Sequence, residues 1–509
     1  ATIDGSLAGG DPLVIAKWAT EKNSIKTPLL DFTNCSFSGL YTNEVIKDSP
    51  RLDPNSKIEV YNFSGNWRGL TMSAPVIVIR NLVTPTVEAD LRSVFPLSKL
   101  NELLLINGLS FPSGNGSLRL QYKGPVDNIT TQTASLNGLV QVQNGSILMK
   151  SSNSLLQNCN ASLRLLNSDI LIDTLKCTIQ QKPIYFTGAA KNVLALLGPS
   201  GGAVSLTLNV SAPVLNIDHL SSIISRKFPS KKPKQGGSTS LAKTAQQIDD
   251  LLSSGNIAVN FSADKLIFHK FEARKANANI LINENSWLLK KASLQHGAGT
   301  MNITAKVSEQ SNEHFGLDAS IQMRNMDAQK AWYEFENFGI KALNYKNIKG
   351  TLSADATVFL TLDRTGSFDM STLSGTADFS IRNGELINFA PVQEIQKVVF
   401  KSRDFSNISF AEIKDKVAFT KGTITIDRME VNSSVFSFFV EGVYALTGNK
   451  TDISIQVPLS NLKKRDKDYK PENLGASRGG GMSIFLRARP GNDGVIKIAY
   501  DPLKRFRKN

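Results

Sequence analysis

The sequence predicts a mainly β protein, built on an elongated, curved antiparallel sheet with a few short capping helices. Three observations support this fold class: apolar and polar residues alternate along many segments, Asn/Gly-rich turns separate these segments, and helical spacing is rare. From Ile453 to Val457, for example, an apolar side chain stands at every second position, and Leu459 continues the pattern. Successive side chains of an extended chain point to opposite faces, so we expect a strand with one apolar and one polar face.

The same alternation predicts strands along much of the chain. The segment 376–384 sets Ala377, Phe379 and Ile381 against Asp378, Ser380 and Arg382. Turn-forming residues follow such runs, and they predict hairpins that pair chain neighbours antiparallel. Further strands are expected at 117–124, 204–210, 256–263 and 482–488, and turns at Asn-Gly 144–145, Asn-Gly 383–384, 447–450 and 490–494.

Helical spacing of apolar residues occurs in four short segments. These helices are expected at 11–23, 240–255, 327–339 and 389–401, with caps at Asp11, Ser240 and Asp327. Lys/Pro-rich and Gly/Ser-rich residues predict a linker or loop at 227–240. The expected organisation is an N-terminal β-rich part (1–226), this linker (227–240), a C-terminal β-groove part (241–462), and a basic loop with the last strands and tail (463–509).

Composition fits a folded protein with an excess of positive charge. The 509 residues are 41% hydrophobic and 20% charged, with a formal charge of +14 and a pI of about 9.5. Basic residues gather at 225–235, 463–470 and 504–509. Such a balance suits polyanionic partners, and solvated linkers with a soluble tail are the alternative. Nucleic acid is excluded as a partner because no recognition-module signature or interleaved aromatic pattern occurs.

No motif for catalysis, metal binding or a cofactor appears, so we expect no enzyme, no metal site and no cofactor. The four histidines have no zinc spacing, and the Gly-rich segment 198–204 lacks the Lys-Ser/Thr of a phosphate loop. Cys35, Cys159 and Cys177 have no CxxC spacing. Cys159 and Cys177 form one bridge in an oxidising compartment, or all three are buried free thiols; both alternatives stay open.

The recurring apolar face must be covered by something, because soluble monomers seldom expose a contiguous apolar patch beyond a few hundred Å². The sheet can pack on a second sheet, close into a barrel, or curl into a trough for an apolar ligand. A sixteen-carbon acyl chain costs roughly 12 kcal/mol to remove from a bilayer, at about 0.8 kcal/mol per methylene, and a lining of Ile, Val, Leu and Phe offsets this cost. Pattern alone favours a dry sandwich core.

The C-terminal part resembles the C-terminal region of the AsmA family of Gram-negative bacteria. The resemblance is carried by "NIKGTLSADATVFLTLD" (347–363), by "LSGTADFSIRNGELINFAPVQEIQKVV" (373–399) and by the strand–turn–strand run at 419–460. The segments 63–91 and 255–282 are similar to the preceding repeats of the family. The Lys-rich finish at 483–509 is similar to versions found in Bacteroidetes-type bacteria.

This resemblance implies a relative of the bridge-like lipid transfer proteins, whose sheet curls into a taco-like groove or partly closed barrel. It implies a periplasmic protein that is anchored to the inner membrane by a segment absent from this chain, which begins with Ala1 instead of Met. Its expected role is non-enzymatic transport of phospholipid to the outer membrane. The expected partners are phospholipid or other acyl lipid, bacterial membranes and envelope proteins, and the basic tail is expected to hold anionic membrane surface.

The expected groove residues lie on the apolar faces of the C-terminal strands. Two other functional classes compete. An assembly factor for outer-membrane proteins predicts open strand edges and a dry interior. A secreted carbohydrate-binding or adhesin protein needs exposed aromatic platforms, and the four tryptophans show no such pattern. The groove candidates are Val358, Leu360, Leu362, Ala377, Phe379, Ile381, Ile424, Ile426, Ile453, Ile455, Val457 and Leu459.

Overall fold

The chain folds into two compact units. Unit 1 comprises Ala1–Pro213 and Lys231–Asn260, and unit 2 comprises Val214–Ser230 and Phe261–Asn509. The linker expected at 227–240 and the helix expected at 240–255 lie outside the described residues. The computed structural model describes residues 2–4, 11–26, 31–104, 109–127, 134–150, 153–193, 204–217, 256–283, 286–311, 314–363, 368–400, 403–446, 450–462, 465, 469–471, 482–491, 496–502 and 504.

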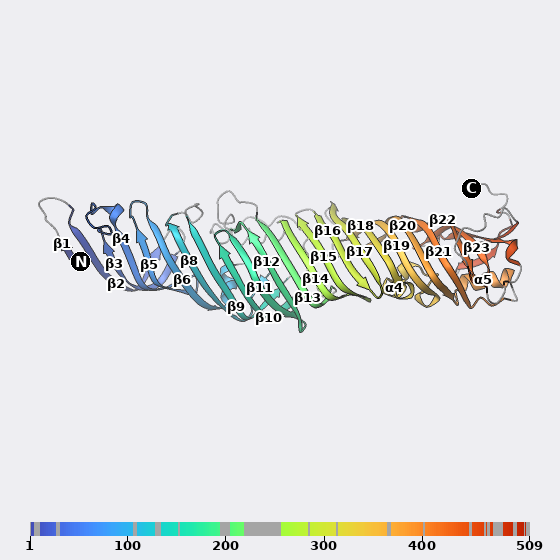
Figure 1. Cartoon of the computed structure of the whole chain (residues 1–509), viewed down its shortest axis with the longest axis horizontal. Coiled ribbons are helices and arrows are strands. Elements are labelled where there is room, and N and C mark those ends of the chain that lie inside the picture. Colours follow the sequence, from blue (N-terminus) through green and yellow to red (C-terminus); the bar gives the residue numbers. More distant parts are fainter. Residues whose placement is uncertain are drawn as a thin grey trace. The chain divides into compact units, whose positions relative to one another are not determined.

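Unit 1 is an open, curled antiparallel sheet whose strands follow one another in chain order (Figure 1). In its described part, the departure from this order is the two-residue β7, which pairs with β9, while β6 pairs directly with β8. The strands are β1 (Thr2–Asp4), β2 (Leu13–Lys26), β3 (Asp31–Thr42), β4 (Lys57–Trp67), β5 (Leu70–Arg80), β6 (Thr86–Pro96), β7 (Leu109–Ser110), β8 (Asn115–Pro125), β9 (Ser135–Met149), β10 (Ser154–Leu166), β11 (Asp169–Ile179), β12 (Lys182–Lys191) and β13 (Ser205–Asn216); the helices are η1 (Asp53–Asn55), η2 (Leu97–Lys99) and α1 (Leu100–Leu104).

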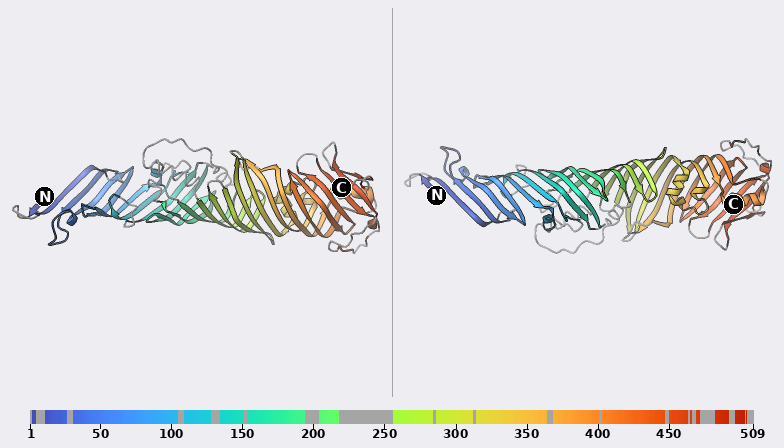
Figure 2. Two further views of the ribbon diagram at one scale, coloured as in Figure 1. Left: turned by 90° about the horizontal axis from the view of Figure 1, so that it is seen from above. Right: turned by 90° about the horizontal axis from the view of Figure 1, so that it is seen from below.

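Unit 2 repeats this architecture (Figure 2). Each strand from β15 to β26 pairs antiparallel with the next one along the chain. The strands are β14 (Asn256–Phe268), of which the residues up to Asn260 belong to unit 1, β15 (Phe271–Asn283), β16 (Ser286–His296), β17 (Gly299–Ser311), β18 (His314–Asp327), β19 (Ile348–Asp363), β20 (Phe368–Ile387), β21 (Asn407–Thr420), β22 (Thr423–Ser433), β23 (Ser437–Ala445), β24 (Asp452–Pro458), β25 (Ser483–Pro490) and β26 (Ile496–Tyr500); the helices are α4 (Ala328–Glu334), η4 (Glu336–Gly339), η5 (Tyr345–Asn347), α5 (Ala390–Val399) and η6 (Leu459–Leu462).

The predicted fold class is confirmed: the protein is mainly β, with antiparallel pairing and few short helices. Two of the expected helices are also present. The helix expected at 327–339 is α4, and its cap is Asp327, whose carboxylate accepts a hydrogen bond from the Lys330 backbone N–H at 2.8 Å. The helix expected at 389–401 is α5.

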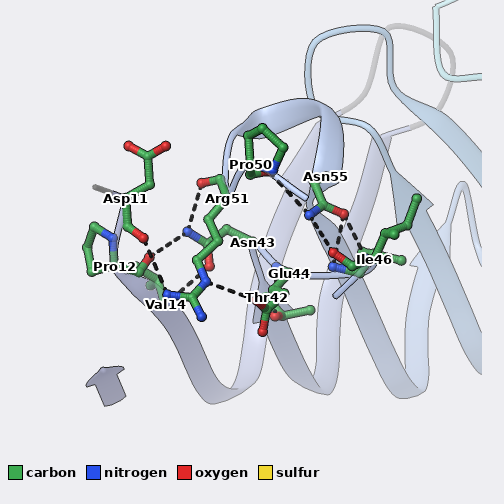
Figure 3. A network of polar contacts seen from close by, with 11 residues as sticks. Asp11, Pro12, Val14, Thr42, Asn43, Glu44, Ile46, Pro50, Arg51 and Asn55 are labelled. Carbon is green, nitrogen blue, oxygen red and sulfur yellow. Dashed lines mark hydrogen bonds and ion pairs between the residues drawn. The ribbon is translucent and has the colours of Figure 1, made fainter. Parts of the chain in front are cut away.

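The helix expected at 11–23 is wrong, because this segment forms β2. A buried asparagine holds the start of the strand (Figure 3): Asn43 accepts a hydrogen bond from the Val14 N–H at 2.8 Å and donates to the Pro12 carbonyl at 3.0 Å. Further along, Trp18 pairs with Gly39 of β3, and its ring occupies the space that a side chain at position 39 would need. Tertiary pairing thus overrides the local helical spacing.

The Asn-Gly pairs at 144–145 and 383–384 do not form the expected hairpin turns. Each lies inside a long strand, β9 or β20, at a shift of the ladder register. Asn144 and Asn383 take left-handed conformations with φ of 48° and 49°. A β carbon on Gly384 would lie 2.3 Å from the Phe410 ring, so the close approach of the strands requires glycine there. These sites are β-bulges, which increase local twist and bend a sheet.

Helix α4 lies at one end of β18 and β19 (Figure 1) and is fixed by a buried polar pair. The His296 Nε2 atom of β16 lies 2.6 Å from Oε2 of Glu334 on the helix, and both side chains are almost fully buried. The Phe271 ring stacks on the His296 ring with centroids 5.3 Å apart. Trp332 of the same helix is also buried. Because a buried polar group is costly without its hydrogen-bond partner, we expect this pair to set the position of the helix.

Replacing one member of this pair should release the helix. We expect Glu334→Ala to lower the local opening free energy of α4 by roughly 3 kcal/mol, since it leaves buried His296 without its partner. Hydrogen exchange of the α4 amides measures this change. The matched control is Glu336→Ala, because Glu336 is 79% exposed in its ion pair with Lys270, and it should cost less than about 1 kcal/mol. Equal effects of the two substitutions would contradict the role of the buried pair.

Candidate apolar groove

Unit 2 carries two continuous rows of apolar residues that run from strand to strand on one face. In each ladder, an apolar residue of one strand is the register partner of an apolar residue of the next. We call this face the groove face. Row 1 is Ala278–Ala292–Ile303–Ile321–Ala356–Ala377–Val417–Ile426–Gly442–Ile453–Ala488–Ile498, and row 2 is Ile280–Leu289–Ala305–Ala319–Val358–Gly375–Phe419–Ile424–Tyr444.

The middle of the groove face is only half-buried. Ile303, Ile321 and Ala356 of row 1 and Ala305 and Ala319 of row 2 all keep part of their surface exposed. A closed apolar core would bury such residues, as most are in protein interiors. The half-buried rows therefore form an open apolar surface in this part of unit 2.

Two other parts of the sheet are covered more completely: the strand ends near α4 and the C-terminal strands near α5. Met301, Met323 and Met326 are buried on the side where α4 lies. At the C-terminal end, the side chains of Val392 and Ile395 of α5 are buried. A cluster of aromatic rings with neighbouring centroids 4.8–5.8 Å apart fills this end further: Phe400, Phe405, Phe436 and Phe438.

The opposite face of the sheet is polar and carries cross-strand ion pairs. Arg324 of β18 donates two hydrogen bonds to the Asp355 carboxylate of β19, at 2.7 and 2.8 Å. Arg382 of β20 pairs with Glu412 of β21 at 2.9 Å. The Arg324–Asp355 pair is exposed and contributes little stability, but it keeps this face hydrated. The sheet of unit 2 is therefore apolar on one side and polar on the other.

The predicted groove residues lie together on the groove face, except for Leu459. That residue begins η6 and is not part of strand β24, which ends at Pro458. Leu360, Leu362 and Ile424 are buried in one cluster, and five further candidates pack against it half-buried: Val358, Ala377, Phe379, Ile426 and Ile453. The remaining candidates, Ile381, Ile455 and Val457, are buried at 3%, 5% and 1% exposure.

Sequence reasoning missed the part of the groove face on β16 to β18. Its members include Ile303, Ala319 and Ile321. Alternation in β17 was a usable signal, since Met301, Ile303 and Ala305 stand at every second position. In β16 the signal is broken, because a register shift between Leu289 and Ala292 moves the apolar residues to the other parity.

Unit 1 carries apolar rows of the same kind. A shallow depression of about 520 Å³ includes Val142, Ala161, Leu175 and Phe186 in its lining, and these four residues are consecutive members of one row. One row is Trp18–Gly39–Val60–Ile77–Ala89–Tyr122–Leu136, and another is Phe95–Gly116–Val142–Ala161–Leu175–Phe186–Val210.

A half-buried carboxylate interrupts the groove face of unit 2. Asp415 of β21 is the register partner of Phe379, so its side chain belongs to the apolar side. It is half-buried, and its Oδ2 atom is buried without a hydrogen-bond partner. Burial raises the pKa of this carboxyl, and the negative charges of Asp427 and Asp378 add to the rise.

Among the described residues, no group of side chains is arranged to hold a metal ion. Cys35, Cys159 and Cys177 are buried free thiols. No helix in the described part of the chain has the length and apolar composition to cross a bilayer. Two basic side chains of the expected charge clusters are bound within unit 2: Arg465 donates to the Ser433 carbonyl, and Lys504 pairs with Glu441.

A scan of protein-family models finds no match to the sequence, and a search of curated proteins finds none either. The resemblance to the AsmA family therefore stays a prediction.

Replacing Asp415 should stabilise the fold in a pH-dependent way. Because its folded-state pKa lies above the usual 3.8, the folded state keeps the proton at a pH where the unfolded chain has released it. Stability is therefore lost as pH rises from 3.8 through the folded pKa. We expect Asp415→Asn to add about 1 kcal/mol near neutral pH, since it removes a poorly paired buried charge. The gain should shrink toward acid pH.

Urea unfolding at several pH values measures this gain. The matched control is Asp378→Asn, because Asp378 lies on the polar face and pairs with Lys416 at 3.9 Å. It should give no gain. A gain for Asp415→Asn that is the same in acid and at neutral pH would show that ionisation of this carboxyl is not the cause.

Proposed function

We propose that this protein handles phospholipid without catalysis, by binding acyl chains along the groove face. The observation that supports this most directly is the half-buried state of the apolar rows across β16 to β19. An apolar surface of this extent is costly in water, and an acyl chain is a ligand that removes it from water. Lipid headgroups would stay at the polar rim of the sheet.

The length of row 1 suits this ligand. It runs from β15 to β26, and strands lie about 4.8 Å apart, so the row measures about 50 Å along the sheet. The hydrocarbon core of a bilayer is about 30 Å thick and consists of two leaflets. One acyl chain spans one leaflet, so it is roughly 15 Å long. Row 1 is thus long enough for several chains placed end to end. Movement along it would keep the apolar environment of a chain nearly constant.

The resemblance to the AsmA family extends this proposal to a cellular role. In that role the protein would act in the periplasm of a Gram-negative bacterium, anchored to the inner membrane by a segment outside this chain, and deliver phospholipid to the outer membrane. Its partners would be the two membranes and envelope proteins that receive the lipid. Exchange between membranes needs no chemical step, because no covalent bond of the lipid changes.

The competing functions fit the described residues less well. An assembly factor was expected to have a dry, filled interior, whereas Ile321 and Ala356 remain half-buried. A carbohydrate-binding protein needs a platform of several exposed aromatic rings. Trp332 is buried, Trp67 and Trp287 are half-buried, and Trp18, which is 37% exposed, lies with its ring over Gly39. Lipid handling is the function that uses the open apolar face.

Charges placed on the groove face should abolish lipid binding. We expect the double variant Ala319→Asp/Val358→Asp to carry at least about tenfold less phospholipid than the natural chain, because each carboxylate must be desolvated beside an acyl chain. The two positions are register partners and half-buried. Organic extraction of the purified chain followed by lipid mass spectrometry measures the bound lipid.

The same ladder offers a matched control. Ser320 and Thr357 are also register partners and point to the polar face. The variant Ser320→Asp/Thr357→Asp should keep its lipid, and circular dichroism should show the same strand content in both variants. Equal lipid content in all three proteins, or no phospholipid in the natural chain, would overturn the proposed function.

A further inference from the structure

A short segment between α4 and η5 lies on the groove face of unit 2. We call residues 336–344 the strap. Its side chains Ile340 and Ala342 pack against a cluster of buried residues, which we call the bed. The bed is formed by Phe315, Leu360, Leu362, Leu373, Val417, Ile424, Tyr444 and Leu446.

A tyrosine of a distant strand holds the strap in place. The Tyr444 hydroxyl oxygen of β23 accepts hydrogen bonds from the backbone N–H groups of Lys341 at 3.0 Å and Ala342 at 3.3 Å. Tyr444 is 8% exposed. The strap belongs to the connection between β18 and β19, and the tyrosine ties this connection to a strand more than a hundred residues later in the chain. We call these two hydrogen bonds to the Tyr444 hydroxyl the latch.

The beginning of the strap has an unusual backbone. Glu336, Asn337, Phe338 and Gly339 all have positive φ, between 50° and 73°. Left-handed conformations are unfavourable for residues with a β carbon, and Asn and Gly tolerate them best. Glu336 and Phe338 therefore hold a conformation that the surrounding contacts must stabilise. Release of the latch would allow this turn to relax.

Row 1 leads from the open part of the groove face directly to the bed on which the strap packs. Row 1 passes from half-buried Ile321 and Ala356 to Ala377, and then to Val417, which is 8% exposed and belongs to the bed. An acyl chain that follows this row reaches the residues against which the strap packs. At this point Ile340 and Ala342 pack against the bed.

We propose that the bed is an acyl-chain site that the strap occupies in this structure, so that strap and lipid compete for it. This inference rests on the proposed function, because it assumes that acyl chains use the groove face. The strap then separates the open stretch of the rows, where Ile303, Ile321 and Ala356 are half-buried, from the closed stretch over the bed. Opening the Tyr444 latch joins the two parts.

The test compares lipid access on the two sides of the strap. Photo-cross-linking p-benzoylphenylalanine is placed in the full chain at Phe419, which packs against the bed, or at Trp287, on β16 in the open part. Each protein is mixed with vesicles of phosphatidylethanolamine and phosphatidylglycerol and irradiated. Tyr444→Phe should raise cross-linking at position 419 by about fivefold, because it removes the acceptor of two hydrogen bonds. Cross-linking at position 287 should not change.

Two further variants test whether the change in cross-linking is caused by the strap. Ile340→Ala weakens the strap from its own side without touching the bed and should raise cross-linking at position 419 in the same direction. Tyr333→Phe is the control, because the exposed Tyr333 lies on α4, packs against Tyr345 and loses only its hydroxyl. It should leave both positions unchanged. Hydrogen exchange of the Lys341 and Ala342 amides should quicken in Tyr444→Phe and stay the same in Tyr333→Phe.

The possible failures are distinguishable. Cross-linking at position 287 alone, in the natural chain and in both strap variants, would overturn this inference and leave the proposed function standing. Equal cross-linking at position 419 with and without the latch would also overturn it, because the strap would then not exclude lipid. An absence of cross-links at both positions in every variant would overturn the proposed function and this inference together.

Discussion

The register of the antiparallel ladders is the constraint on which the rest of the structure depends. A strand has a side-chain period of two, so a shift of one residue in any ladder would turn its apolar residues to the polar face. In unit 2 the register keeps Ile303, Ile321 and Ala356 in one line, while Arg324 and Asp355 pair on the other side. The groove face exists only because every ladder from β15 to β26 respects this alignment.

Bulges allow the sheet to bend without losing this alignment. In β18, Met323 and Met326 are register partners of Ala354 and Leu352, and a left-handed Asn325 lies between them. Asn383 in β20 acts in the same way, so that Ile381 and Leu386 both belong to the apolar side. An inserted residue adds twist and curvature, which a trough needs. The strap and α4 then cover parts of a surface that the curl has already formed.

The sequence predicted those features that alternation alone determines. Strand β24 and the apolar face of Ala377, Phe379 and Ile381 followed from period-two patterns. Features that depend on distant partners did not follow. The helical spacing of 11–23 could not reveal that Asn43 and β3 hold this segment extended, and Asn-Gly at 144–145 has the same local chemistry in a turn and in a bulge. The strap also escaped, because its partner Tyr444 is remote in the chain.

The most direct test of the account is the water accessibility of the groove face with and without lipid. A nitroxide label at Ala305→Cys reports from row 2, and one at Lys306→Cys reports from the polar face; the native cysteines are buried and should not take the label. In lipid-free protein both labels should meet a water-soluble relaxation agent, and adding phospholipid should shield only position 305. A label at position 305 that is shielded already without lipid would show a closed core and contradict the groove.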